Sequence, residues 1–122
     1  KEKFETVKKI SQIDKLQLDL KEDNKTDYIE IKKHKVQYLY FLCGFLGPYL
    51  NDVDQYVGDL ASIILAEGIS SRLYKVLREE KRLVYEISSG FYTQIGPSIF
   101  YIFGICEPKN FQESIKLIRE EM

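Results

Sequence analysis

The stretch EGISSRLYKVLREEKRLVYEISSGFY, residues 67–92, decides the fold of this chain. Gly68 can take the left-handed conformation that ends one helix, and Ser70 or Ser71 can cap the next. Apolar residues then recur at helical spacing, and they are Ile69, Leu73, Val76 and Leu77. From Leu83 onward the period changes to two, which indicates a strand. The stretch therefore predicts an amphipathic helix with one buried face, followed directly by a strand.

Two polar side chains in this stretch, Arg78 and Tyr85, are the candidate site residues. Within one straight helix they would lie about 10 Å apart, whereas a helix-to-strand turn between them allows both to converge on one point. The guanidinium is a planar fork of donors for carboxylates or carbonyls, and the phenol is a neutral donor. The alternative is structural. Arg78 would then pair with Glu79 or Glu86 at the surface, and the tyrosine would pack in a sheet.

The patterns elsewhere predict an α+β domain with helices packed on a mainly antiparallel sheet. The expected elements, in order, are strands at 28–35 and 36–46, a helix at 53–64, the helix and strand of the opening stretch, a strand at 99–106, and a helix after Pro108. The first strand alternates and should have one wet face, whereas strands 36–46 and 99–106 are apolar throughout and should be central.

Both flanking helices carry an apolar face. In the helix at 53–64 that face is broad and should lie against the sheet; it consists of Val53, Tyr56, Val57, Leu60, Ala61 and Ile64. In the closing helix the expected buried stripe consists of Phe111, Ile115, Ile118 and Met122.

The composition limits which binding partners and which cellular compartment we expect for the protein. The 122 residues allow one domain, and 18 basic and 19 acidic side chains, interspersed along the chain, give a net charge of −1. No field of one sign exists to attract nucleic acid or a membrane surface, and no apolar run reaches the ~18 residues of a membrane span. Cys43 and Cys106 lie in apolar runs as two buried thiols, which favours a reducing, cytoplasmic location.

The chain carries no catalytic centre that its own sequence reveals. His34 is its single histidine, so a metal motif with two histidines is impossible. Glu30 lies four residues earlier on an expected strand and makes a poor ligand set with it, and the neighbouring lysines indicate a solvated side chain. No nucleophile elbow and no phosphate-binding loop is present. We expect no metal and no cofactor in this segment.

Several runs of residues carry a resemblance to a known family. They are SSRLY at 70–74, LREEKRLVY at 77–85, SS at 88–89, GFLGP at 44–48 and CEPKN at 106–110. Together they resemble the insulinase-like zinc metallopeptidases, which include pitrilysin and the mitochondrial processing peptidases. The resemblance lies in the half-domain without the zinc motif and covers residues 27–122. Val84 departs from the family, which commonly has glycine or alanine there, but the spacing of Arg78 and Tyr85 is preserved.

The resemblance implies where the chain begins and ends as a domain. In the family a polar connector precedes a domain of this kind. Residues 1–26 are accordingly expected to be a connector or the end of a preceding domain, and residues 27–122 the non-metal peptidase domain. Because the sequence stops within a helical pattern at Met122, we expect this domain to be incomplete at its C-terminal end.

The resemblance also implies a function. Peptidases of this family are clam-shells of paired halves, in which one half binds zinc through an inverted histidine motif and the other supplies an arginine and a tyrosine. By this resemblance Arg78 and Tyr85 contact a peptide substrate, and Tyr85 also hydrogen-bonds the transition state. Zinc is expected in a partner half, in the same chain or in another subunit. Two alternatives stay open: a catalytically inactive assembly subunit of the same family, and a generic α+β binding module.

Overall fold

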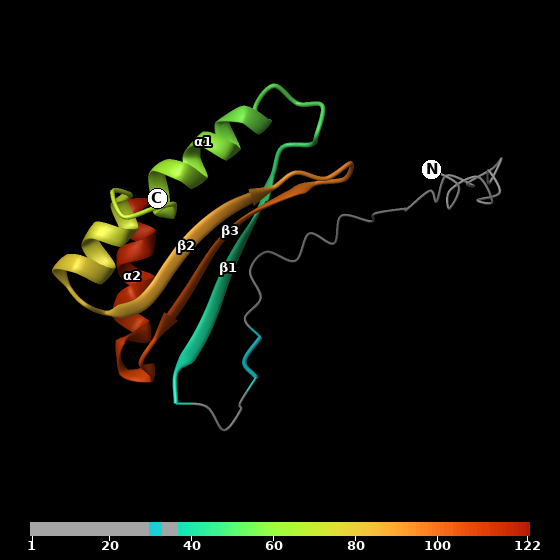
Figure 1. Cartoon of the computed structure of the whole chain (residues 1–122). Helices are drawn as coiled ribbons and strands as arrows, with labels where there is room; N and C mark the ends of the chain where they lie inside the picture. Colours follow the sequence, from blue (N-terminus) through green and yellow to red (C-terminus); the bar gives the residue numbers. More distant parts are fainter. Residues whose placement is uncertain (1–29, 33–36) are drawn as a thin grey trace, which may run out of the picture. The chain divides into compact units, whose positions relative to one another are not determined.

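The computed structural model describes residues 30–32 and 37–122. The chain divides into two compact units, Lys1–Lys33 and His34–Met122, and the fold below is that of the second. Its elements, in order, are β1 (Leu39–Gly47), α1 (Gln55–Ala66), the π-helix η2 (Tyr74–Glu80), β2 (Val84–Tyr92), β3 (Ser98–Cys106), the short 3₁₀-helix η3 (Pro108–Asn110) and α2 (Phe111–Glu121) (Figure 1). The predicted α+β class is confirmed.

The three strands form one antiparallel sheet in the order β1-β3-β2. The prediction that 99–106 is central is therefore confirmed, whereas the prediction that 36–46 is central and covered on both faces is wrong. β1 is an edge strand among the described residues, and Leu42 on its outer face is 65% exposed. A continuous apolar run cannot distinguish a covered strand from an edge strand whose second face is open.

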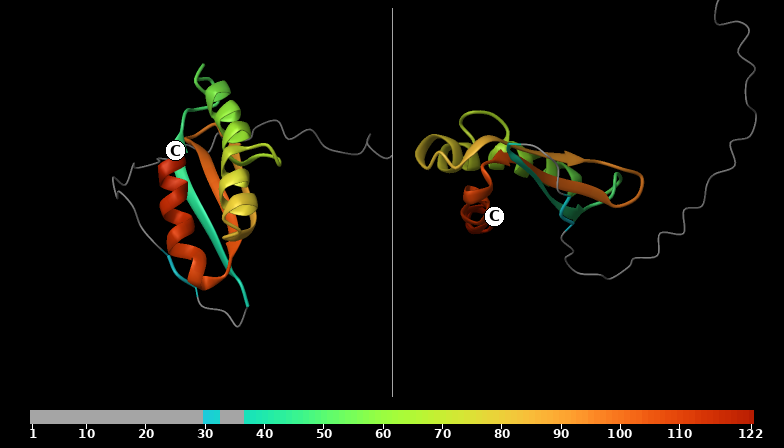
Figure 2. Two further views of the ribbon diagram at one scale, coloured as in Figure 1. Left: turned by 90° about the vertical axis from the view of Figure 1, so that its left-hand side faces the viewer. Right: turned by 90° about the horizontal axis from the view of Figure 1, so that it is seen from below.

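Both helices lie on the same face of the sheet (Figure 2). Strand alternation directs Phe41, Ile87 and Ile102 toward them, and these three side chains are buried. Leu73 and Leu77 from the helical segment after α1, together with Ile118 from α2, complete this core. The face of the sheet that the helices cover is thus the hydrophobic core, and packing against it holds residues 72–85 in place.

The expected packing of α1 is wrong for most of its length. The helix begins at Gln55 and buries only Ser62, Leu65 and Ala66, near its C-terminal end. The apolar side chains of its earlier turns are exposed, Val57 by 62%. α1 packs mainly against β2, so only its last turns reach the core. Spacing predicts that a face is apolar, but it does not tell which part of that face is covered.

Some of the remaining predictions concern residues that the structure describes, and others concern residues outside that part. The closing helix is confirmed, with Ile118 buried and Phe111 and Ile115 packed against the core, but Met122 is exposed. The strand predicted at 28–35 is absent at 30–32, and its other residues lie outside the described part of the chain. The connector predicted at 1–26 and His34 also lie outside it. No helix in the described part is long and apolar enough to cross a membrane.

Candidate functional site

The helix that carries Arg78 is wider than predicted. Spacing indicated an α-helix, but Tyr74–Glu80 form a π-helix, in which the amide of Lys81 donates to the carbonyl of Val76 at 3.0 Å. Ile69 precedes this helix and is exposed, contrary to its predicted place in the buried stripe. π-Helical segments are rare and occur frequently at functional sites, and the segment Tyr74–Glu80 contains the arginine that the sequence selected.

The turn that follows is compact and strained. Arg82 has φ 53°, a left-handed conformation that is unfavourable for a side chain with a Cβ atom. The amide of Leu83 then donates to the carbonyl of Leu77 at 2.8 Å. With these contacts the chain passes from helix to strand within three residues.

Tyr85 stands on a β-bulge at the start of β2. Val84 lies opposite Cys106 and Glu86 lies opposite Ile105, so Tyr85 has no partner of its own in β3. A bulge re-aims the side chain of its extra residue. Val84 is accordingly buried, while Tyr85 is 49% exposed, and the phenol is accessible to a ligand.

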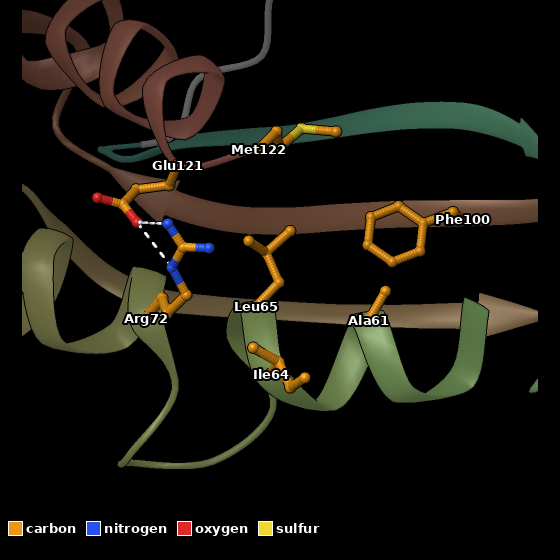
Figure 3. A pocket seen from close by; sticks show the side chains of 7 residues that line it. All are labelled: Ala61, Ile64, Leu65, Arg72, Phe100, Glu121 and Met122. Atoms are coloured by element: carbon orange, nitrogen blue, oxygen red, sulfur yellow. Dashed lines mark hydrogen bonds and ion pairs between the residues drawn. The ribbon is translucent and has the colours of Figure 1, made fainter. Parts of the chain in front are cut away.

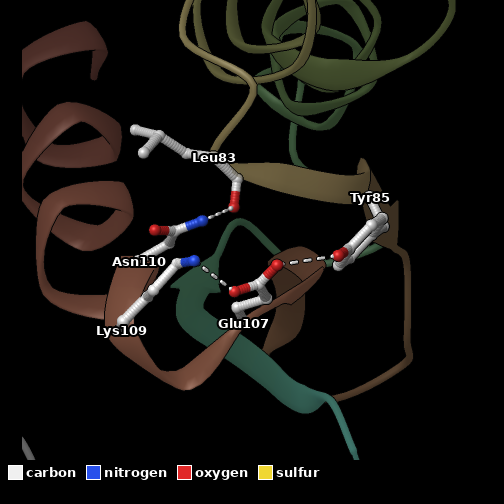
Figure 4. A network of polar contacts seen from close by, with 5 residues as sticks. All are labelled: Leu83, Tyr85, Glu107, Lys109 and Asn110. Carbon is white, nitrogen blue, oxygen red and sulfur yellow. Dashed lines mark hydrogen bonds and ion pairs between the residues drawn. The ribbon is translucent and has the colours of Figure 1, made fainter.

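The hydroxyl of Tyr85 is hydrogen-bonded to a carboxylate. Tyr85 donates a hydrogen bond to Oε1 of Glu107 at 3.0 Å, and Nζ of Lys109 lies 2.7 Å from Oε2 of the same carboxylate (Figure 4). The ring of Tyr38 contacts the ring of Tyr85 edge-on, with centroids 4.8 Å apart. We call these four residues, Tyr38, Tyr85, Glu107 and Lys109, the Tyr85 cluster.

The cluster shifts the ionisation of both of its hydrogen-bonded acids. The hydrogen bond to Glu107 raises the pKa of the Tyr85 phenol, and the charge of that carboxylate and the neighbouring Tyr38 add to the effect. The hydrogen bonds from Lys109 and then from Tyr85 lower the pKa of Glu107. Near neutral pH the cluster therefore holds a neutral phenol on an ionised carboxylate.

Arg78 has a different partner. Its guanidinium lies over the ring of Tyr74, 5.2 Å from the centroid, and its side chain is exposed. Among the described residues no hydrogen bond or ion pair joins Arg78 to Tyr85, to Glu79 or to Glu86. Two donors that face one substrate need no contact with each other, so the convergence of Arg78 and Tyr85 on one point stays a prediction. Both groups are accessible, on either side of one helix-to-strand turn.

The sequence did not single out Tyr38, Glu107 or Lys109 as site residues, although Glu107 and Lys109 stand in the CEPKN run at 106–110. A signal for Glu107 existed, because two antiparallel strands with a short turn place the end of β3 beside the start of β2. Tyr38 lies next to Leu39, which pairs with Cys106. Strand register alone therefore brings these residues to one end of the sheet.

A hollow between the C-terminal ends of α1 and α2 offers less chemistry. It measures about 410 Å³ and is lined by Ala61, Ile64, Leu65, Arg72, Phe100, Glu121 and Met122 (Figure 3). Its one polar feature is the ion pair of Arg72 with Glu121 at 2.8 Å, in which each charge already has its partner. Nothing in this lining marks a catalytic group.

Metal binding has no support in the described part of the chain. Residues 30–32 and 37–122 contain no group of three or more histidine, cysteine, aspartate or glutamate side chains that could hold a metal ion. The Tyr85 cluster contains one carboxylate, and a lysine and a phenol already occupy it.

Known proteins that this chain matches include one sequence relative and two solved structures, and a family model also matches it. A family model described as the peptidase M16 inactive domain matches residues 1–122. The chain is 25% identical over 97 residues to a protein described as an uncharacterized zinc protease from Streptomyces coelicolor, and the match covers 77% of this chain and 20% of that protein. Its structure is similar to the crystal structure of a peptidase M16 inactive domain from Pseudomonas fluorescens, with a TM-score of 0.66 and 24% identity over 70% of this chain and 21% of that one.

A second solved structure, that of a protease from Helicobacter pylori, has a TM-score of 0.62 and 27% identity over 70% of this chain and 22% of that one. The chain thus spans about a fifth of the length of the relatives it matches.

Proposed function

Because the chain belongs to the peptidase M16 inactive-domain family, we propose that it is the substrate-binding, non-metal half of a zinc-dependent endopeptidase. Family membership confirms the resemblance to the insulinase-like metallopeptidases. The similarity to a protein described as a zinc protease supports a zinc-bearing partner half, in the same polypeptide or in another subunit. The substrate we propose is a peptide that is bound in a closed chamber between the two halves.

The observation that carries the proposal is the placement of Tyr85. The bulge opposite Cys106 leaves this residue unpaired in the sheet and turns its ring outward, and the hydroxyl lies in a polar cluster rather than in the core. A tyrosine that served only to pack the sheet would not need an exposed phenol with a charged partner. Arg78, exposed and supported by Tyr74, lies across the same turn.

The roles follow from the chemistry of the two groups. Zinc bound by the other half supplies a Lewis acid and an activated water. Tyr85 donates a hydrogen bond to the oxyanion that develops on the scissile carbonyl, and one such donor is worth about 10²- to 10³-fold in rate. Arg78 binds a carbonyl or carboxylate of the peptide and fixes its register. Activity then depends on closure of the two halves, which excludes water from the site.

Mutation of the full-length protein with its zinc-bearing half tests these roles. Tyr85→Phe should lower kcat by about one to three powers of ten without changing the zinc content, and Arg78→Ala should mainly raise KM. Tyr92→Phe is the matched control, because Tyr92 is an exposed tyrosine at the other end of the same strand. Wild-type turnover in both site variants would show that the assigned roles are wrong.

The same preparation tests the alternative of an inactive assembly subunit. That alternative predicts a full-length protein without zinc, without hydrolysis of a quenched unstructured peptide, and with no effect of Tyr85→Phe. We also propose a cytoplasmic location, which is supported by the free thiols of Cys43 and Cys106, although only Cys106 is buried and Cys43 is half-buried, not buried as predicted. Alkylation of both thiols in unfolded protein taken from non-reducing extracts would test it.

A further inference from the structure

We propose that Glu107, anchored by Lys109, is the positioning residue that holds the hydroxyl of Tyr85 for catalysis. This inference rests on the proposed function and adds to it a residue that the sequence did not select. The carboxylate is fixed from both sides, since Oε1 accepts from Tyr85 at 3.0 Å and Oε2 pairs with Lys109 at 2.7 Å. Each oxygen thus has its own donor, which restricts rotation of the carboxylate.

The backbone places Glu107 at a rigid point. It directly follows the end of β3 at Cys106 and precedes Pro108, whose ring fixes φ. Cys106 pairs with both Leu39 and Val84. The ends of all three strands therefore meet at the residue before Glu107, and the backbone of Glu107 directly continues the sheet.

The phenol is held on two sides as a result. Glu107 binds its hydroxyl and Tyr38 contacts its ring edge at 4.8 Å. A phenol has one proton to donate and lone pairs that accept. Rotation of the O–H bond alone moves that proton from the carboxylate to a substrate oxygen, while the ring stays in place. The carboxylate thereby keeps the ring oriented and the phenol protonated until the substrate arrives.

Lys109 offsets the negative charge that Glu107 places near the substrate. A bare carboxylate next to a developing oxyanion would repel it, because like charges at short range are unfavourable. The ammonium at 2.7 Å offsets the charge of Glu107. The two residues together place less negative charge behind the hydroxyl of Tyr85 than the carboxylate alone would.

A double-mutant cycle in the full-length zinc-containing protein tests the proposal. Glu107→Ala should lower kcat about three- to tenfold, the range that the net contribution of an ordinary hydrogen bond gives, with KM unchanged. The same substitution in a Tyr85→Phe background should have no further effect, because Glu107 acts only through the hydroxyl. Glu107→Gln keeps an oxygen acceptor and should recover part of the loss, and Glu113→Ala on α2 is the control.

The outcomes separate this inference from the proposed function. No effect of Tyr85→Phe would overturn both. A loss with Tyr85→Phe but none with Glu107→Ala would overturn the role of Glu107 alone. An equal loss from Glu107→Ala in both backgrounds would make Glu107 merely structural, and a gain in kcat would show that it competes for the proton; both results overturn the proposal.

A spectroscopic readout does not depend on activity. Ultraviolet difference titration of wild type against Tyr85→Phe isolates the ionisation of this phenol. Glu107→Gln should move that ionisation to lower pH, because the charge that disfavours the phenolate is gone. An unchanged titration would show that the contact is not formed in solution and would overturn the proposal.

Discussion

The side-chain amide of Asn110 donates a hydrogen bond of 3.2 Å to the main-chain carbonyl of Leu83, across 27 positions of the sequence. It joins the start of α2 to the turn that leads into β2 (Figure 4). Glu107 lies three residues before the donor, and Tyr85 lies two residues after the acceptor. The contact therefore fixes the distance between the two backbone segments that carry the Tyr85 cluster.

Asn110→Ala should lower the free energy of unfolding by about 1 kcal/mol, because the partly buried carbonyl of Leu83 loses its donor. The side chain of Asn110 makes no capping bond to α2, so the loss reports the contact with Leu83. Gln112→Ala, at an exposed position of α2, is the control and should change little. Urea unfolding followed by circular dichroism measures both, and equal effects would contradict this account.

The sequence predicted the class of the fold because periodicity reports which faces are apolar. It placed the helix-to-strand turn at Leu83 and the central strand at 99–106, and it selected Tyr85 through a family resemblance. It failed at β1 and α1, where the apolar faces are present but open. Whether an apolar face is covered depends on the surface that packs against it, and this leaves no periodic signal in the sequence.

The geometry of the site was harder to predict from the sequence than the identity of its residues. A π-helix differs from an α-helix by one extra residue per hydrogen-bonded turn, and the spacing of Leu73 and Leu77 fits both. The bulge at Tyr85 arises only when β2 is set against β3. The contact with Glu107 depends on that register, so a pattern confined to residues 67–92 could not have revealed it.

Gly104→Ala should destabilise the domain by about 1–3 kcal/mol, the usual cost of overpacking a core. Gly104 lies opposite Phe41 in the central strand, and an added methyl group would overlap the buried ring of Phe41. Gly44→Ala in β1 is the matched control, because the nearest atom, on Leu42, would lie 3.9 Å away. Thermal unfolding of both variants compares them, and equal losses would show that the ring of Phe41 does not fill this space.

Arg82→Gly should raise the free energy of unfolding by about 0.5–1 kcal/mol. Its φ of 53° is strained for any residue with a Cβ atom, and glycine removes that strain at some cost in unfolded-state entropy. Lys81→Gly is the control, because Lys81 has φ −95° and glycine there should only destabilise. Denaturant midpoints at equal slope measure both, and a loss in both variants would contradict a strained turn.

Tyr74→Leu should raise KM about two- to fivefold at unchanged kcat in the full-length protein. The substitution keeps an apolar side chain on the core but removes the ring beneath Arg78, and an exposed cation–π contact is worth about 0.5–1 kcal/mol. Tyr74→Phe keeps the ring and should behave as wild type. Steady-state kinetics on a quenched peptide separates the two, and identical KM values for both variants would show that Tyr74 does not orient Arg78.

The stability of the Tyr85 cluster should depend on pH at both ends of the range. The pKa of Glu107 lies below its ordinary value of 4.5, so its contribution is present above that value and is lost as pH falls through the lowered pKa. The pKa of Tyr85 lies above its ordinary value of 10.0, so its contribution is present below that value and is lost as pH rises through the raised pKa.

Glu107→Gln should therefore flatten the acid side of the stability profile, because the amide does not titrate. Tyr85→Phe should flatten the alkaline side and reduce the acid dependence in part, since Lys109 continues to hold the carboxylate. The measurement is the free energy of unfolding against pH at constant ionic strength, taken as the difference between wild type and each variant. The control is Glu113→Gln, which removes an exposed carboxylate in the first turn of α2. A difference curve for Glu107→Gln that stays flat between about pH 3 and pH 6, the range in which a glutamate titrates, would show that the carboxylate gains nothing from its two donors.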